Sequence, residues 1–382
     1  RYPYLDWIKA NRINLNDQSW AVKNDFEKSE LLQKQIAFGF SSEDFDYIIN
    51  SMAANAKEPT FCMGDDIPLA ILSNKSHILY DYFKQRFAQV TNPPIDPLRE
   101  KLVTSLEMHL GIRRAPLIPK KESARLIHIK SPIINEKELI EIKKLELDFK
   151  EISTLIPFND DINNLEIGLK DLCKKAEESV INGAEILILS DRDINRETTY
   201  IPPLLAVGSV HHHLLRKGLR LNTSIVIDTA QCWSTHHIAC LIGYGASAIC
   251  PWLMWETTRH WWQLPKTQKL ISDGKLSNLS IETSQENVKK SLEDGLRKIL
   301  SKIGISVLAS YHGAQIFEAI GIGADLIDLA FKGTTSRIAG LTIKELSIET
   351  ISFHKKAFPE LEQKKLDFNG FVQYRNSGEF HL

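Results

Sequence analysis

Three short apolar runs alternate with two amphipathic segments in the middle of the chain. The runs are Ile186–Leu189, Ile225–Ile227 and Ala246–Cys250, and the first two lack the in/out alternation of a half-exposed strand. The segments between the runs cover residues 202–216 and 234–243 and carry apolar positions at helical spacing. Buried strands joined by helices are typical of a parallel sheet. The pattern therefore predicts βαβαβ units and an α/β fold.

Periodic apolar positions predict further elements on both sides of this stretch. Helices are expected over residues 41–56, 79–90, 98–110, 165–180 and 286–299. A short strand is expected at Val307–Ala309, with a helix opening at Tyr311 and ending at Gly321. We interpret this last βα unit as the start of a second domain.

A carboxylate stands at the end of each of the first two predicted strands. Asp191 follows the first strand and Asp228 follows the second. Ligands of parallel α/β folds bind at the carboxyl ends of the strands, so both aspartates are candidates for a binding site. In the alternative interpretation they cap the next turn or pair with Arg192. The sequence favours this structural role and leaves the other open.

Two sequence patterns resemble a cofactor site and a metal site but lack a feature that such sites require. Gly243–Ala248 matches G-x-G-x-x-A, but it follows a helix and opens a strand, whereas the dinucleotide motif does the opposite. Gly243 is therefore interpreted as the glycine that ends a helix. His211–His213 and His236–His237 lack the H-x-x-x-H spacing of zinc ligands, so packed histidines and no metal site are expected.

Composition and charge narrow the class of protein only slightly. A hydrophobic content of 43%, a charged content of 25% and a net charge of −1 are those of a globular protein, with no indication of nucleic acid as a partner. No apolar run approaches the roughly 18 residues of a membrane-spanning helix. Five cysteines fit a reducing compartment. Because the chain begins at Arg1 and stops in an extended pattern, we expect it to be a piece of a longer polypeptide.

Long strings of this sequence resemble one family, the glutamate synthases, and within it the ferredoxin-dependent branch. The resemblance covers nearly everything from Gln35 onward. The strings that carry it are Gln35–Gly39 (QIAFG), Met63–Ala70 (MGDDIPLA), Tyr82–Arg99, Ile186–Arg192 (ILILSDR), Ile201–Leu214, Asp228–Trp252 and Ser301–Gly321.

The resemblance implies an α/β central domain with a parallel βαβ sheet, followed by the first part of an FMN-binding (β/α)8 barrel. The implied divisions are 1–34, a linker from a glutaminase domain; 35–256, the central domain; 257–285, a connection; and 286–382, the incomplete start of the barrel. The implied compartment is the plastid stroma, or the cytoplasm for a bacterial protein.

The implied reaction is that of an oxidoreductase. It forms two L-glutamate from L-glutamine and 2-oxoglutarate, with electrons from reduced ferredoxin through a 3Fe–4S cluster and FMN. FAD is a further candidate cofactor, and neither nucleic acid nor a membrane span is implied. The nucleophilic cysteine and the cluster cysteines of the family have no match in this chain. The fragment alone is therefore expected to be inactive.

The resemblance implies few site residues in this chain. Glu318 and Gln315 are the catalytic candidates. The cofactor-binding candidates are Met63, Gly64, Asp65, Ser306, Tyr311 and Gly313. Spacings of four and three place Tyr311, Gln315 and Glu318 on one side of a helix, if that helix begins near Tyr311. The alternative is that this polar side faces water.

The chain departs from the family pattern at two positions, and two other functions stay open. Cys62 stands where serine is usual, and His312 stands where cysteine or arginine is expected. In one alternative, residues 35–256 only brace two active domains and line an ammonia tunnel. In the other, the chain is an unrelated α/β ligand-binding protein.

Overall fold

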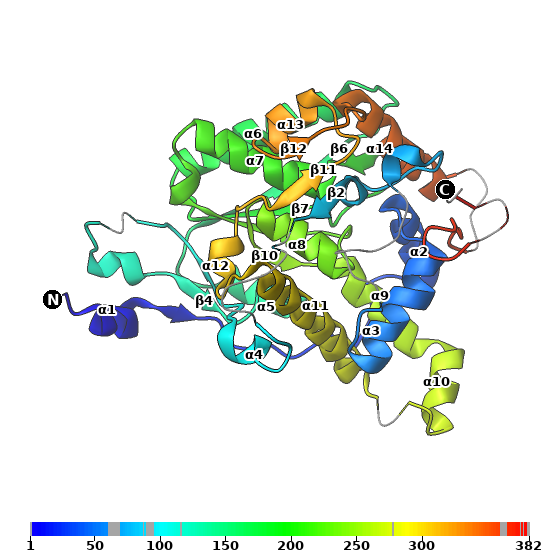
Figure 1. The fold of residues 1–382 in the computed structure, drawn as a ribbon, viewed down its shortest axis with the longest axis horizontal. Helices are drawn as coiled ribbons and strands as arrows, with labels where there is room; N and C mark the ends of the chain where they lie inside the picture. Colours follow the sequence, from blue (N-terminus) through cyan, green and yellow to red (C-terminus); the bar gives the residue numbers. More distant parts are fainter. Residues whose placement is uncertain are drawn as a thin grey trace.

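The centre of the computed structural model is a four-stranded parallel sheet in the order β10-β9-β7-β5 (Figure 1). The structure describes residues 2–59, 69–86, 88, 95–114, 117–276, 279–359, 365–374, 376 and 378–379. The sheet strands are β5 (Phe149–Ser153), β7 (Ile186–Ser190), β9 (Ser224–Asp228) and β10 (Ala246–Cys250). The three predicted strands and the predicted α/β class are therefore confirmed.

Every residue of β7, β9 and β10 is buried, which explains why these strands lack in/out alternation. The helices that connect the strands are α6 (Asn164–Ile181), α7 (Pro203–Arg216) and α8 (Thr235–Gly243). Helix α7 packs against both α6 and α8, as expected when neighbouring parallel strands are joined by successive right-handed crossovers. All three predicted helices are confirmed, and α8 ends at Gly243 as expected.

Smaller sheets surround the central one. The first has the order β1-β4-β3, the second β12-β11-β2, and β6 pairs with β8. Their strands are β1 (Ile13–Asn14), β2 (Phe83–Gln85), β3 (Met108–Leu110), β4 (Ile127–Ile129), β6 (Leu155–Pro157), β8 (Thr198–Tyr200), β11 (Phe317–Ala319) and β12 (Thr335–Ser336). Because β2 pairs with β11, the sheet joins segments that are more than 200 residues apart in the sequence.

The remaining helices lie outside these sheets, and some pack on other helices, as α10 does on α9 (Figure 1). They are α1 (Tyr4–Asn11), α2 (Lys28–Ala37), α3 (Asn50–Asn55), α4 (Glu100–Val103), α5 (Glu136–Ile142), α9 (Trp252–Gln263), α10 (Pro265–Ser272), α11 (Ile281–Ile303), α12 (Leu308–Tyr311), α13 (Ala324–Ala330) and α14 (Ile343–Ala357). A π-helical segment, Asp44–Ile49, leads into α3. The predicted helices at 41–56 and 286–299 are confirmed.

The predicted helix over residues 79–90 is wrong. Leu79–Tyr82 form a short 3-10 helix, and β2 follows directly. The Phe83 side chain is buried and meets the rings of Tyr244 and Phe331 edge-on. Residues Phe87 and Val90 lie outside the described residues. Strand pairing with β11 therefore overrides a local aromatic pattern that suggested a helix.

The predicted helix over residues 98–110 is only partly present. Helix α4 ends at Val103, and the chain then enters β3, which pairs with β4. Leu110 is buried in that sheet, whereas Leu98 and Leu102 are 94% and 83% exposed. The spacing of four between these leucines therefore does not mark one continuous buried face.

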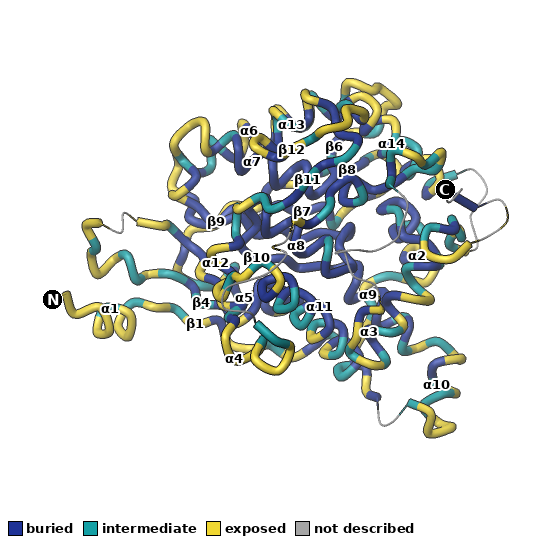
Figure 2. Tube along the Cα trace, viewed as in Figure 1, coloured by how far each residue is buried: buried dark blue, intermediate teal, exposed yellow. Residues whose placement is uncertain are grey.

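The segment predicted as a connection, residues 257–285, is largely helical. It contains the end of α9, all of α10 and the start of α11. Helix α9 lies in the dark, buried interior of Figure 2, and Arg259 is fully buried beside the carboxylates of Glu136 and Glu256. Whether this segment separates two domains stays a prediction.

Candidate functional site

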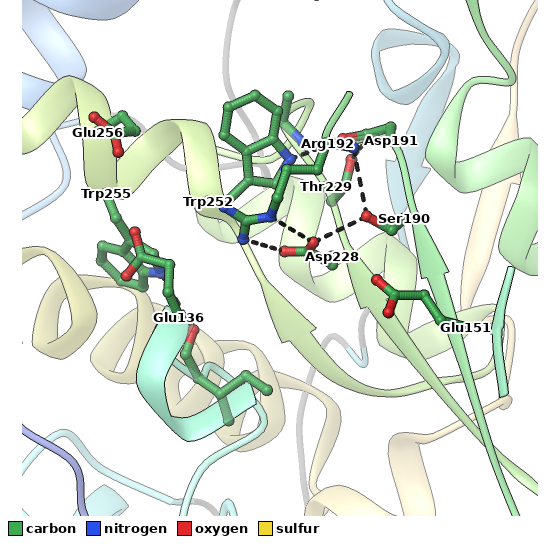
Figure 3. A network of polar contacts seen from close by, with 12 residues as sticks. Glu136, Glu151, Ser190, Asp191, Arg192, Asp228, Thr229, Trp252, Trp255 and Glu256 are labelled. Atoms are coloured by element: carbon green, nitrogen blue, oxygen red, sulfur yellow. Dashed lines mark hydrogen bonds and ion pairs between the residues drawn. The ribbon is translucent and has the colours of Figure 1, made fainter. Parts of the chain in front are cut away.

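Asp191 and Asp228 lie together at the carboxyl edge of the central sheet (Figure 3). Asp228 ends β9 and receives two bonds from Arg192, Nε to Oδ2 at 2.9 Å and Nη2 to Oδ1 at 2.7 Å. The Ser190 hydroxyl donates a third bond, at 3.0 Å. This two-pronged geometry is the strong form of an arginine–carboxylate pair. The predicted pairing with Arg192 is thus confirmed for Asp228.

Asp191 holds the chain that follows β9. Its Oδ1 accepts bonds from the Ala230 backbone N–H and the Trp252 indole N–H, each 2.9 Å long, and its Oδ2 accepts the Thr229 hydroxyl. The residue is 1% exposed, and burial raises the pKa of its carboxyl group to about 7, although these hydrogen bonds oppose the shift. Asp191 therefore acts as a buried anchor of the following turn.

Two more carboxylates, the half-buried Asp44 and the buried Glu58, anchor the loop from Thr229 to Thr235. Asp44 accepts the indole N–H of Trp233 at 3.0 Å, and Glu58 accepts the backbone N–H and the hydroxyl of Thr235. Burial raises the pKa of Asp44 to about 6 and that of Glu58 to about 7. Because Thr235 is the first residue of α8, Glu58 stabilises the beginning of that helix from outside it.

The role of Glu58 could not be recognised from its sequence neighbourhood, because its partner is 177 residues away. Glu58 precedes residues 60–68 in the sequence, and Ile71 follows them. The Ile71 side chain packs against Gly321, where an added Cβ atom would meet it. The predicted contacts Met63, Gly64 and Asp65 lie outside the described residues. Their neighbours on the two sides are thus held near α8 and near the end of β11.

The predicted βα unit at residues 307–321 is wrong. Val307 makes one parallel bridge to Ser105, and the next residues form the short helix α12 instead of a strand. Gln315 has a φ of +53°, a left-handed conformation that interrupts any helix opened at Tyr311. The chain then enters β11, so Tyr311, Gln315 and Glu318 do not share a helix face.

Tyr311, Gly313 and Gln315 are turned toward the rest of the domain. The Tyr311 hydroxyl donates to Gln85 Oε1 at 2.6 Å. The Gly313 N–H donates to the Ile242 carbonyl at 3.0 Å, at the end of α8. The Gln315 amide lies 3.1 Å from His212 Nε2, on α7. These groups therefore join α12 and the segment before β11 to strand β2 and to helices α7 and α8.

Glu318 and Ser306 lie nearer the surface. Glu318 is half-buried in β11, where it is paired with Lys84 on one side and with Thr335 on the other. Its Oε1 is 3.9 Å from Arg337 Nη1, a loose ion pair in which the arginine is 76% exposed. Ser306 is exposed, and its carbonyl accepts the Ser105 N–H at 2.7 Å. The structure does not bring these two residues together with Gln315.

A buried cluster of basic groups, which sequence reasoning missed, lies behind this segment. Arg220 donates to His211 Nδ1 at 2.9 Å and to the Gly245 carbonyl at 2.8 Å, and the same carbonyl lies 3.0 Å from His312 Nε2. Burial and the Arg220 charge lower the pKa of His211 to about 3, and the same causes place the pKa of His312 well below its usual range. These histidines are therefore packed within the fold, as was expected for His211.

Gly245 is required by this packing. Its φ is +119°, and a Cβ atom there would lie 2.3 Å from His211 Nδ1. This explains the second glycine of the pattern that resembles a nucleotide motif. Within the described ranges, no group of three or more histidine, cysteine or acidic side chains is arranged to hold a metal ion.

Three of the predicted site residues already have hydrogen-bond partners within the chain. The donors of Tyr311, Gly313 and Gln315 are already engaged within the chain. Cys173, Cys232, Cys240 and Cys250 are buried and form no disulfide among the described residues, and Cys62 lies outside the described residues. We therefore derive no chemical step through FMN or a 3Fe–4S cluster from this geometry.

The parallel sheet, its covering helices and the buried carboxylates at its edge define an α/β domain. The family model described as "Glutamate synthase central domain" matches residues 33–323. The chain therefore belongs to the glutamate synthase central domain family.

Three relatives that match the whole chain are named as ferredoxin-dependent glutamate synthases. The chain is 56% identical over 387 residues to ferredoxin-dependent glutamate synthase 2 of Synechocystis sp., covering 100% of this chain and 25% of that protein. The enzyme of Pyropia yezoensis is 53% identical over 384 residues, with the same coverage. The chloroplastic enzyme of Spinacia oleracea is 51% identical over 387 residues, covering 100% of this chain and 24% of that protein. This chain thus spans about a quarter of their length.

Solved structures that align with much of the chain include a flavin-binding domain. The flavin-binding domain of baker's yeast flavocytochrome b2 has a TM-score of 0.38 and 9% identity, covering 82% of this chain and 93% of that domain. A TM-score this low assigns no shared fold.

Proposed function

We propose that this chain is part of a ferredoxin-dependent glutamate synthase. The proposed reaction forms two L-glutamate from L-glutamine and 2-oxoglutarate, with electrons from reduced ferredoxin. The observation that carries the proposal is 56% identity across the full length of this chain to a relative of that name. In this proposal the chain contributes the central domain and the entry to the flavin-binding barrel, and the remaining domains supply the glutaminase and electron-transfer chemistry.

FMN and a 3Fe–4S cluster are the proposed cofactors of the whole enzyme, with FAD as a further candidate. When bound in the whole enzyme, FMN would supply the hydride for reduction at the synthase site, and most of its contacts would lie outside this chain. Met63, Gly64, Asp65, Ser306, Tyr311 and Gly313 are proposed at the edge of the synthase site. Glu318 and Gln315 are proposed as its catalytic residues, with Glu318 orienting the oxoacid or handling a proton.

A second candidate function is bracing without catalysis, including the lining of an ammonia tunnel. The polar groups at the carboxyl edge of the sheet favour it. The Asp228 carboxylate accepts hydrogen bonds from Arg192 and Ser190, and the Asp191 carboxylate accepts them from the turn after β9. Carboxylates whose acceptor positions are occupied within the chain hold structure in place. On this view the residues near the sheet position two active domains.

The compartment is proposed from the relatives. The spinach enzyme is named as chloroplastic, and the plastid stroma is the proposed location for a plant or algal protein, the cytoplasm for a bacterial one. In the part of the chain that the structure describes, no helix has the length and apolarity needed to cross a membrane.

The experiment compares the 382-residue chain with the intact enzyme. Each is assayed for glutamate formation from glutamine and 2-oxoglutarate with reduced ferredoxin, and for bound iron and flavin. The intact enzyme is expected to turn over and to hold both cofactors. The chain alone is expected to bind no iron and form no glutamate. Stoichiometric iron or turnover in the chain alone would contradict the proposed division, and an intact enzyme inactive with ferredoxin would contradict the proposed function.

A further inference from the structure

A cavity of about 680 Å³ lies between four helices, away from the carboxyl edge of the sheet. Helix α7 packs against α6 and α13, and the beginning of α14 closes the fourth side (Figure 1). The floor is formed by Leu169, Cys173, Leu329 and Ile343. We call this space the α6–α7–α13 groove. Its volume is within the range of about 300–1,000 Å³ that small-molecule sites occupy.

One buried hydroxyl in this groove has no partner. Ser209 lies in the middle of α7, is 1% exposed and lines the groove. Among the described residues its Oγ atom has no hydrogen-bond partner. Buried hydroxyls in native proteins are nearly always satisfied, because leaving one unpaired is costly. The Ser209 hydroxyl therefore has hydrogen-bonding capacity that no described group of the protein uses.

The charges around the groove leave a cationic excess. Glu166 pairs with Lys170 at 2.6 Å, and Asp325 accepts the Ile343 backbone N–H at 2.9 Å, so both acids have partners. Arg216 donates to the backbone carbonyls of Asp328 and Leu329.

Lys344 is exposed at the first turn of α14, and no carboxylate of the described residues lies within 4 Å of it or of Arg216. Two cations without carboxylate partners thus stand at the rim of an apolar groove. Such a rim attracts an anionic group, and the apolar floor favours a hydrophobic body.

We propose that the α6–α7–α13 groove binds a small amphipathic anion. Its apolar body lies on Leu169 and Leu329, an acceptor atom bonds the Ser209 hydroxyl, and its anionic end lies near Lys344 and Arg216. This site is separate from the proposed synthase site and does not depend on the proposed function.

The test is a fluorescence titration of the intact protein with 1-anilinonaphthalene-8-sulfonate, an amphipathic anion. The uncharged analogue N-phenyl-1-naphthylamine has nearly the same body without the sulfonate. Lys344→Glu reverses the charge at the rim, and Lys290→Glu makes the same change on the exposed side of α11. Ser209→Ala removes only the hydroxyl.

We expect Lys344→Glu to weaken binding of the sulfonate probe about tenfold and to leave binding of the uncharged analogue unchanged. Ser209→Ala should weaken the sulfonate about threefold, and Lys290→Glu should change neither probe. Circular dichroism confirms that each variant is folded, and Lys344→Gln, with a smaller expected effect, replaces the charge reversal if that variant does not fold. Equal affinities in wild type and in both lysine variants would overturn the proposal. A folded Lys344 variant that no longer binds either probe would also overturn the proposal.

Discussion

Arg192 and Asp228 form a two-pronged ion pair across the ends of neighbouring strands, with N–O distances of 2.9 and 2.7 Å. Asp228 is 1% exposed, and the Arg192 side chain is 27% exposed. The pair therefore joins β7 to β9 at the edge where a parallel sheet usually binds its ligand. Here that edge is filled by the protein's own groups.

Asp228→Ala should lower the stability of the protein without removing its activity. Truncating one partner of a largely buried pair leaves the other charge uncompensated, which typically costs about 3–5 kcal/mol. Urea unfolding measures this change, and Glu166→Ala, which breaks the exposed pair with Lys170, is the matched control at about 0–1 kcal/mol. If folded Asp228→Ala loses turnover in the intact enzyme, Asp228 takes part in catalysis and the bracing role is wrong.

Asp191 should make the stability depend on pH. Its pKa is raised from 3.8 to about 7 in the folded protein by burial, so folding favours the protonated form. The stabilising contribution is complete below about pH 4 and is lost as the pH rises through about 7. At 1.36 kcal/mol per pKa unit, the loss is on the order of 4 kcal/mol.

Asp191→Asn should flatten the stability–pH curve between pH 4 and 7. The amide oxygen keeps the Oδ1 acceptor for Ala230 and Trp252, and the amide nitrogen can donate to the Thr229 oxygen. Urea unfolding across this pH range measures the slope. Asp193→Asn makes the same change at an exposed position two residues away and should leave the slope as it is. An unchanged slope in Asp191→Asn would mean that this carboxyl group does not bind a proton in the folded state.

The central sheet could be predicted because its signals are local. Uniformly apolar runs such as Ile186–Leu189 and the periodic helices between them follow from burial on both faces of a parallel sheet. The misplaced elements depend on distant partners. Phe83 is in a strand because β11 pairs with β2, and helix α4 stops because residues from Met108 pair with β4. Neither partner can be recognised within the local sequence.

The candidate site was harder to predict for the same reason. The positions of Asp191 and Asp228 at the strand ends followed from the βα pattern. Their role depends on Arg192 and on the turn at Thr229, and the sequence could only name these alternatives. The positive φ of Gln315 is unusual for a residue with a side chain, so nothing in the spacing indicated that the predicted helix would be interrupted.

The histidines of α7 should not contribute stability through a metal. His211 accepts the Arg220 N–H, and burial with the nearby Arg216 charge lowers the pKa of His212 to about 4. A structural zinc adds its binding free energy to folding, so chelation would lower the melting temperature markedly. Thermal melts with and without EDTA are expected to coincide. A large drop on chelation would contradict the packed arrangement of His211 and His212.

Glu318 provides the sharpest test of the proposed synthase site. It lies in β11, half-buried, and its Oε1 atom is 3.9 Å from Arg337 Nη1. A pair this loose leaves the carboxylate available to an oxoacid or a proton. Removing a positioned acid–base group typically lowers the rate by about 10²–10⁴. We therefore expect Glu318→Ala in the intact enzyme to lower 2-oxoglutarate-dependent glutamate formation by that factor.

The assay uses reduced ferredoxin as electron donor, with flavin content and circular dichroism measured on the same samples. Glu293→Ala is the matched control, because Glu293 also makes a loose pair, at 3.8 Å with Arg297, and lies on α11. Glu318→Gln keeps the size of the side chain and removes its charge, so it should share the defect if the carboxylate acts as a base. Should Glu318→Ala retain normal turnover with flavin bound, Glu318 is a structural strand residue, because neither orientation of the oxoacid nor proton transfer would depend on it.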